Sequence, residues 1–253
     1  MNINHLKRNV MKRNLLLLLL AAISAISVNA ADDNDEYIFR NPSGYWGIRA
    51  SYNLTVPGEY TFSKTKKESV FNPGSGFEAG VTRLIPLVSG LYLEPGAMLF
   101  LDTYSVKSDK VYLFQNGTSI STNKFGMRIP VMAGWQFKFG DKVKLNLFTG
   151  PEFEIGFTGN TTYGYYNGEE TKFDIYSPHT PNRIRNIAVL WEVGTGVSFK
   201  KYYLGVSGHF GLTDMSNNNP EKKFHENHIM VTLGLNLNTY NKKKRSKSVE
   251  TNQ

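Results

Sequence analysis

The chain has 253 residues, a formal net charge of +8 and no cysteine. The charge does not indicate a nucleic-acid-binding protein, because residues 31–240 contain 20 basic and 20 acidic residues and the excess lies at the two ends. The absence of cysteine excludes a disulfide framework and lipid attachment at a mature N-terminal Cys. Composition therefore excludes these classes but does not by itself assign the protein to a compartment.

The first signal that assigns a compartment is at the N-terminus. Basic residues between Lys7 and Arg13 precede the apolar block Leu15–Ile26, and small residues follow up to Ala30. This order is typical of a secretory signal peptide, which we predict to span residues 1–30. The block is shorter than the roughly 20 residues that a membrane-spanning helix needs, and no second block follows, so helical spans are not expected.

Eight segments then show strand-like alternation of apolar and polar or small residues. In chain order they are Tyr45–Leu54, Gly76–Leu84, Leu91–Thr103, Lys124–Phe139, Val143–Thr158, Asn186–Phe199, Tyr202–Leu212 and Asn227–Thr239. The fourth is the most regular, because every odd position is large or apolar. A strand directs successive side chains to opposite faces, so each segment has one apolar face. Several exceed the five or six residues of an ordinary strand, as expected of strands that cross a bilayer.

The connections between these segments alternate in length. Long ones (Thr55–Ser75, Tyr104–Asn123, Gly159–Arg185, Thr213–Glu226) alternate with short ones (Ile85–Gly90, Gly140–Lys142, Lys200–Lys201). The sequence therefore predicts an all-β fold, an eight-stranded antiparallel up-and-down transmembrane β-barrel with its long connections at one end. A lipocalin-like soluble barrel would reverse the two faces, but the polar row is rich in Gly and short of Lys, which favours the membrane barrel.

Aromatic residues are expected to form two belts on the outer wall. Trp46, Trp135, Phe139, Phe199, Tyr202 and Tyr240 lie near the short turns, and Tyr52, Phe125, Phe157 and Phe210 lie near the long connections. Such belts mark the two membrane–water interfaces.

Four segments resemble the outer-membrane β-barrel family that includes the PorT-like proteins and, more distantly, the OmpX and OmpA eight-stranded barrels. They are Trp46–Ala50, Leu91–Gly96, Arg128–Val131 and Val231–Leu237. The resemblance implies an integral outer-membrane protein of a Gram-negative cell and carries over no active-site residues. It implies outer-membrane lipid, lipopolysaccharide and the barrel-assembly machinery as partners, with a secretion role as one alternative.

In bacterial outer-membrane barrels the longer loops face outside the cell and the short turns face the periplasm, so we expect extracellular long loops and two periplasmic termini. We expect a short periplasmic segment at 31–44, the barrel at 45–240 and a basic periplasmic tail at 241–253.

The inward row is expected to form a polar network that fills the barrel. Its predicted members are Arg49, Glu78, Glu94, Arg128, Glu152, Glu154, Glu192 and His209. The short turns pair Phe139 with Val143 and Phe199 with Tyr202. This register places Arg128 opposite Glu154 and Glu192 opposite His209. A structural plug is the preferred interpretation, and a narrow porin-like cation path is the alternative.

Other constellations are weaker. Ser207, His209 and Glu192 could be drawn as a hydrolytic set, but their order and inward direction match no family signature. Glu152 with Glu154 could serve as an acid–base pair, but beside Arg128 in a narrow barrel the pair is interpreted as structural. No enzyme activity, cofactor or metal is therefore expected. His225 and His228, near Glu221 and Glu226, are interpreted as solvated loop residues rather than metal ligands.

Function is therefore expected to reside in the loops, through surface binding, a structural role or assembly contacts. Their aromatic residues are Tyr60, Phe62, Tyr112, Phe114, Tyr163, Tyr165, Tyr166 and Tyr176. These side chains suit either a recognition surface or a loop bundle packed on itself.

Overall fold

A computed structural model describes residues 44–63, 66–113, 118–139, 142–180, 183–216 and 223–237. The predicted signal peptide (1–30), nearly all of the predicted segment 31–44, Tyr240 and the predicted tail (241–253) lie outside the described residues. Within the described ranges, no helix is both long and apolar enough to span a membrane.

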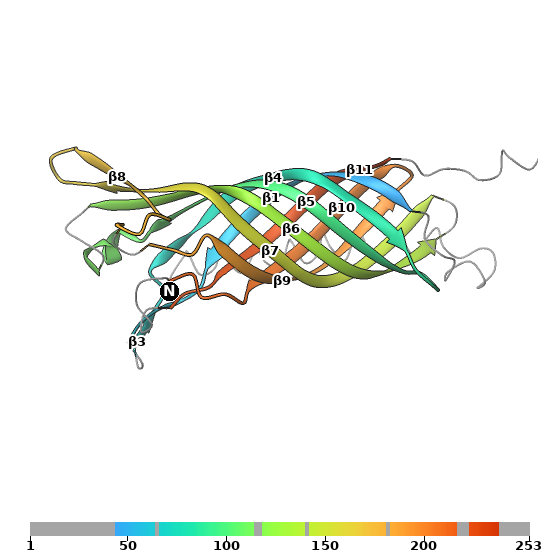
Figure 1. Ribbon diagram of the computed structural model, residues 1–253, viewed down its shortest axis with the longest axis horizontal. Coiled ribbons are helices and arrows are strands. Elements are labelled where there is room, and N and C mark those ends of the chain that lie inside the picture. The colour runs from blue at the N-terminus through green and yellow to red at the C-terminus, as the bar shows by residue number, and fades with distance from the viewer. Residues whose placement is uncertain are drawn as a thin grey trace, which may run out of the picture.

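Eight long strands form the fold. They are β1 (Tyr45–Pro57), β4 (Phe71–Pro86), β5 (Leu91–Val106), β6 (Ser119–Phe139), β7 (Val143–Gly164), β9 (Ile187–Phe199), β10 (Tyr202–Gly211) and β11 (Glu226–Leu237). Each pairs antiparallel with the next one along the chain, and β1 pairs with β11 to close the cylinder (Figure 1). The predicted eight-stranded up-and-down barrel is confirmed.

The connections at the long-loop end contain more structure than the sequence predicted. Short strands β2 (Tyr60–Ser63), β3 (Lys66–Glu68) and β8 (Glu170–Asp174) and the 3₁₀ helix η2 (Ser108–Leu113) lie in segments that we expected to be loops. Several barrel strands also extend past their predicted ends there. Apolar alternation stops where the outer wall is no longer apolar, whereas backbone hydrogen bonding between strands continues through polar residues.

The outer wall of the barrel is apolar. Large apolar side chains of alternate residues are exposed on it, among them Trp46, Ile48, Phe77, Val81, Leu99, Leu101, Leu147, Trp191, Leu204, Ile229 and Leu233. A continuous apolar surface of this extent matches a lipid environment and would be unfavourable in water. The aromatic residues of the two expected belts that the structure describes lie on this wall, except that Phe139 is half-buried.

Inward glycines make room for large rings inside the barrel. A Cβ added at Gly134 would overlap the ring of Tyr92, and one at Gly196 would overlap the ring of Tyr203. Both tyrosines are buried. The glycine-rich polar row therefore reflects a crowded interior, but part of the crowding comes from inward aromatic residues, which the sequence pattern had not indicated.

A hydrophobic cluster closes the long-loop end. Its buried members come from the strand ends and from all four long connections: Tyr60, Val70, Phe71, Tyr104, Val106, Val111, Ile120, Tyr163, Ile175, Ile184, Ala188, Leu190, Met215 and Phe224. Backbone hydrogen bonds tie the connections together, with Thr61 N donating to Lys223 O at 2.8 Å and Arg185 N to Met215 O at 2.9 Å. We call this assembly the loop cap. The hairpin of β7 and β8 projects beyond it (Figure 1).

Candidate functional site

Arg128 lies at the centre of the polar interior. It is on β6 and is fully buried. Its Nε donates to Glu154 Oε2 at 3.0 Å, its Nη1 to Glu78 Oε2 at 3.2 Å, and its Nη2 to Asp102. The guanidinium also lies 4.1 Å from the ring centroid of Phe100. One cation on β6 therefore contacts carboxylates on β4, β5 and β7.

Strand register accounts for the first of these contacts. Phe139 pairs with Val143 across the short turn, and counting back along β6 and β7 pairs Arg128 with Glu154. Glu152, the diagonal neighbour, lies 3.7 Å from Arg128 Nε. The contact expected from the turn length is present, whereas Glu78 and Asp102 reach the guanidinium from strands on its other side.

Lys124 extends the network toward the loop cap. Its Nζ is buried 2.9 Å from Glu154 Oε1 and is also hydrogen-bonded to Glu226. Glu154 therefore accepts from Lys124 through one oxygen and from Arg128 through the other. A buried carboxylate shared by two cations satisfies the requirement that charges removed from water be paired.

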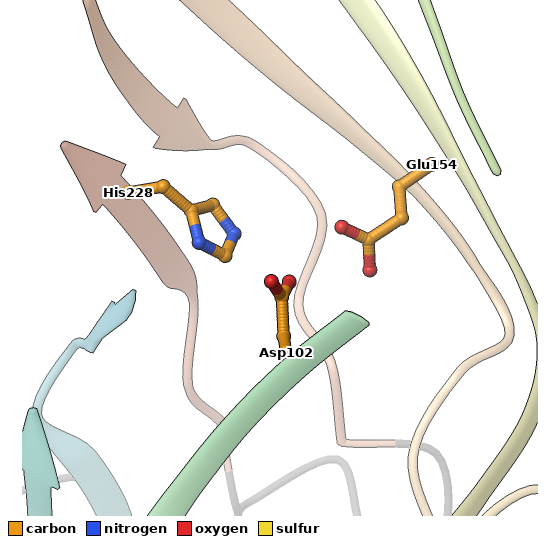
Figure 2. A group of neighbouring side chains, drawn as sticks. All are labelled: Asp102, Glu154 and His228. Atoms are coloured by element: carbon orange, nitrogen blue, oxygen red, sulfur yellow. The ribbon is translucent and has the colours of Figure 1, made fainter. Parts of the chain in front are cut away.

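The structure corrects the interpretation of His228 and Glu226. His228 was expected to be a solvated loop residue and Glu226 to be the last residue of a connection, but β11 begins at Glu226 and both side chains lie on its inward row, where they are buried. His228 Nδ1 lies 3.2 Å from Thr55 Oγ1 and Nε2 lies 3.4 Å from Arg128 Nη2. Asp102, Glu154 and His228 point toward one another (Figure 2), and all three contact Arg128 Nη2.

A second cluster surrounds His209 on β10. Its Nδ1 lies 3.1 Å from Glu152 Oε1, and its Nε2 lies 2.8 Å from Ser207 Oγ and 3.5 Å from Glu192 Oε1. His209 and Glu192 are register partners, as the two-residue turn predicted. The structure thus brings together a serine, a histidine and a carboxylate, the side chains that a hydrolytic set would need. The carboxylate that contacts His209 Nδ1 belongs to Glu152 rather than to Glu192.

The surroundings of Ser207 do not make an active site. Ser207 is buried in the middle of β10, and its backbone is paired with Gly194 on one side and Met230 on the other. Backbone N–H groups in a closed ladder are committed to neighbouring strands, so they cannot form an oxyanion hole beside the hydroxyl. The Glu152 and Glu154 pair is likewise engaged by Arg128 rather than open to a sugar.

Arg49 and Glu94 form a separate pair toward the short-turn end. Arg49 Nη2 lies 3.2 Å from Glu94 Oε1, which also accepts from Thr82 Oγ1 at 2.7 Å. The guanidinium stacks 4.2 Å from the ring centroid of Tyr203. Between this pair and the Arg128 network lies a cavity of about 70 Å³, with Glu78, Glu152 and Glu192 in its lining.

The eight predicted network residues all lie inside the barrel, but four further members had not been named. These are Asp102, Lys124, Glu226 and His228. Each lies near the long-loop end of its strand, where the apolar alternation fades. Asp102 lies an even number of residues from Glu94, and Lys124 an even number from Arg128, so each pair points to the same face of its strand. The sequence therefore contained the signal that Asp102 and Lys124 point inward.

Comparisons with known proteins give one family match and several similar solved structures. A family model described as outer membrane protein beta-barrel domain matches residues 33–217. Ail, the attachment invasion locus protein of Yersinia pestis, solved in complex with the heparin analogue sucrose octasulfate, is 11% identical over 78% of this chain and 100% of that chain, with a TM-score of 0.38.

Two further solved structures are similar at the same level. Neisserial surface protein A is 11% identical over 78% of this chain and 98% of that chain, with a TM-score of 0.37. The N-terminal β-barrel domain of OprF from Pseudomonas aeruginosa is 10% identical over 78% of this chain and 100% of that chain, with a TM-score of 0.30. No curated protein matches the chain.

Replacing Arg128 should destabilise the barrel strongly. Arg128→Met leaves the carboxylates of Glu78, Asp102 and Glu154 buried without their shared cation, and we expect a loss of about 3–5 kcal/mol in the free energy of unfolding. Unfolding by guanidinium chloride in detergent micelles, followed by tryptophan fluorescence, measures this free energy.

The matched control is Arg83→Met, which removes an arginine that lies 5.2 Å from the ring centroid of Trp46. A loss below about 1 kcal/mol is expected there. Equal losses in the two variants would show that the Arg128 contacts do not stabilise the fold.

Proposed function

Because the chain belongs to the family of outer membrane protein beta-barrel domains, we propose that it is a plugged, non-conducting outer-membrane barrel that acts at the cell surface through its loop cap. The observation that supports this proposal is the filled interior. Side chains occupy the barrel from one end to the other, so the space in which transport or catalysis would occur is small.

Three layers block the axis. The loop cap covers one end, the Arg128 network crosses the middle, and a cluster of Tyr45, Leu84 and Tyr92 with Phe148 fills the barrel toward the short turns. An eight-stranded barrel is just wide enough for its interior to be filled by side chains. The cavity of about 70 Å³ between the layers holds only a few water molecules.

The loop cap is the part of the molecule that offers a binding surface. In bacterial outer-membrane barrels the long loops are extracellular and the short turns periplasmic, which would place the cap outside the cell and both termini in the periplasm. Tyr60 and Tyr163 are buried in the cap, whereas Tyr112 and Tyr166 are 69% and 92% exposed. Exposed tyrosines on an ordered support suit recognition of a partner at low entropic cost.

The proposed partners follow from this position. The apolar outer wall contacts outer-membrane lipid and lipopolysaccharide, and the barrel-assembly machinery inserts the protein. A narrow porin-like cation path is the second candidate, favoured by the carboxylates that line the interior cavity. The two functions differ in whether ions cross the three layers.

Purified full-length protein should not conduct in a planar lipid bilayer. We expect no stepwise current with the wild-type chain, because Arg128 and the loop cap fill the axis. A larger bacterial porin, measured in the same bilayers, serves as the positive control. Reproducible unitary currents that Glu154→Gln alters would contradict the plugged barrel and favour the cation path.

The orientation can be tested with single cysteines, since the natural chain has none. Tyr166→Cys, on the projecting hairpin, should react with a membrane-impermeant maleimide on intact cells. Lys201→Cys, in the turn between β9 and β10, should react only after the outer membrane is permeabilised. The reverse pattern would place the loop cap in the periplasm and remove the proposed surface role.

A further inference from the structure

Two groups of carboxylates and histidine in the described part of the chain have the spacing of metal ligands. One consists of Asp102, Glu154 and His228, the other of Glu152, Glu192 and His209. In each, one ligand atom per residue lies within 4.8 Å of the others. The two groups differ in what already occupies them.

Fixed cations neutralise the first group. Arg128 donates to both Asp102 and Glu154, and Lys124 donates to Glu154 (Figure 2 shows the three acceptor side chains). A metal ion at this position would have to displace a guanidinium that is hydrogen-bonded in place and would meet the repulsion of two buried positive charges. This group therefore belongs to the structural network.

The second group lacks such occupants. Its only contact with a fixed cation among the described residues is that of Glu152 Oε1 with Arg128 Nε, at 3.7 Å. The contact of Glu152 with His209 uses the same oxygen. The three side chains come from β7, β9 and β10, so the closed sheet holds their backbones in fixed positions.

Open space adjoins this second group. Glu152 and Glu192 line the interior cavity of about 70 Å³, together with Glu78 and Glu94. The cavity offers room for the water that completes the coordination shell of an ion held by three protein ligands. Glu94 is paired with Arg49, and Glu78 shares Arg128 with the first group. Negative charge is consequently least compensated beside Glu192.

We propose that Glu152, Glu192 and His209 form a binding site for a divalent transition metal ion, for which Zn²⁺ is the best match. One imidazole nitrogen and two carboxylate oxygens are ligands that suit Zn²⁺, whereas Ca²⁺ and Mg²⁺ prefer oxygen alone. Bonds of about 2.0–2.2 Å place tetrahedral ligand atoms roughly 3.4 Å apart. The three ligand atoms lie within 4.8 Å of one another, so side-chain rotations that shorten their separations by up to about 1.4 Å close the site. In binding the ion, His209 exchanges a hydrogen bond with Ser207 or Glu152 for a metal bond.

This site is independent of the loop cap and of the orientation in the membrane. It departs from the sequence-based expectation that the chain has no metal site. Metal bonds would join β7, β9 and β10 at the level of the interior cavity.

Zn²⁺ binding to the chelator-treated full-length protein in detergent tests the proposal. Calorimetric titration should give one Zn²⁺ per chain. Co²⁺, used as a spectroscopic probe, should give the visible d–d absorption of a low-symmetry site with nitrogen and oxygen ligands. His209→Gln and Glu192→Gln should each weaken Zn²⁺ binding at least tenfold.

Two matched controls locate the site. Glu94→Gln, which alters the same cavity, and His228→Gln, which alters the other group, should bind Zn²⁺ like the wild type. Each variant is checked for folding by its shift in gel migration before and after boiling. If a ligand variant fails this check, the wild-type stoichiometry and Co²⁺ spectrum still test the site.

The proposal is overturned if the wild type binds no stoichiometric Zn²⁺ or if binding survives His209→Gln unchanged. It is also overturned if His228→Gln abolishes binding, because the ion would then lie in the first group.

Discussion

Arg128 is a single cation, removed from water, that contacts carboxylates on three other strands of a closed barrel. Glu78 reaches it from β4, Asp102 from β5 and Glu154 from β7. The strands of a barrel already share backbone hydrogen bonds, but those bonds do not define what fills the middle. The guanidinium of Arg128 does, because its planar fork can donate hydrogen bonds to several carboxylates only in one arrangement. The rest of the interior is organised around this arrangement.

The two faces of the wall solve opposite solvation problems. Outward residues are apolar because the bilayer cannot hydrogen-bond them, and the closed ladder satisfies every strand without an exposed edge. Inward residues are polar, and because little water reaches them they must satisfy one another. Once the inward side chains are paired with one another, a barrel of this width has little free volume left in its interior. This is the physical reason why we propose that the protein acts through its loop cap rather than along the axis.

Sequence alone was sufficient for the strand number, the connectivity and much of the register, since a period of two is unambiguous in long amphipathic strands. It was also sufficient to pair Arg128 with Glu154. It was not sufficient for Asp102, whose contact with Arg128 depends on how far the strands stagger around the cylinder.

The packing of the loop cap could not be predicted either, and His228 was interpreted wrongly. The cap depends on packing among four connections, which no local pattern encodes. His228 lies within the predicted strand Asn227–Thr239 but was interpreted as a solvated loop residue together with the neighbouring His225, whereas the structure buries it on the inward row of β11.

The account depends most on the coupling between Arg128 and its carboxylates, and a double-mutant cycle measures that coupling. The free energies of unfolding of the wild type, Arg128→Met, Glu154→Gln and the double variant give the interaction energy between the two side chains. We predict a coupling of about 1.5–3 kcal/mol, at the upper part of the range for buried neighbours. A coupling near zero would show that the two charges do not stabilise each other and would contradict the central role of the network.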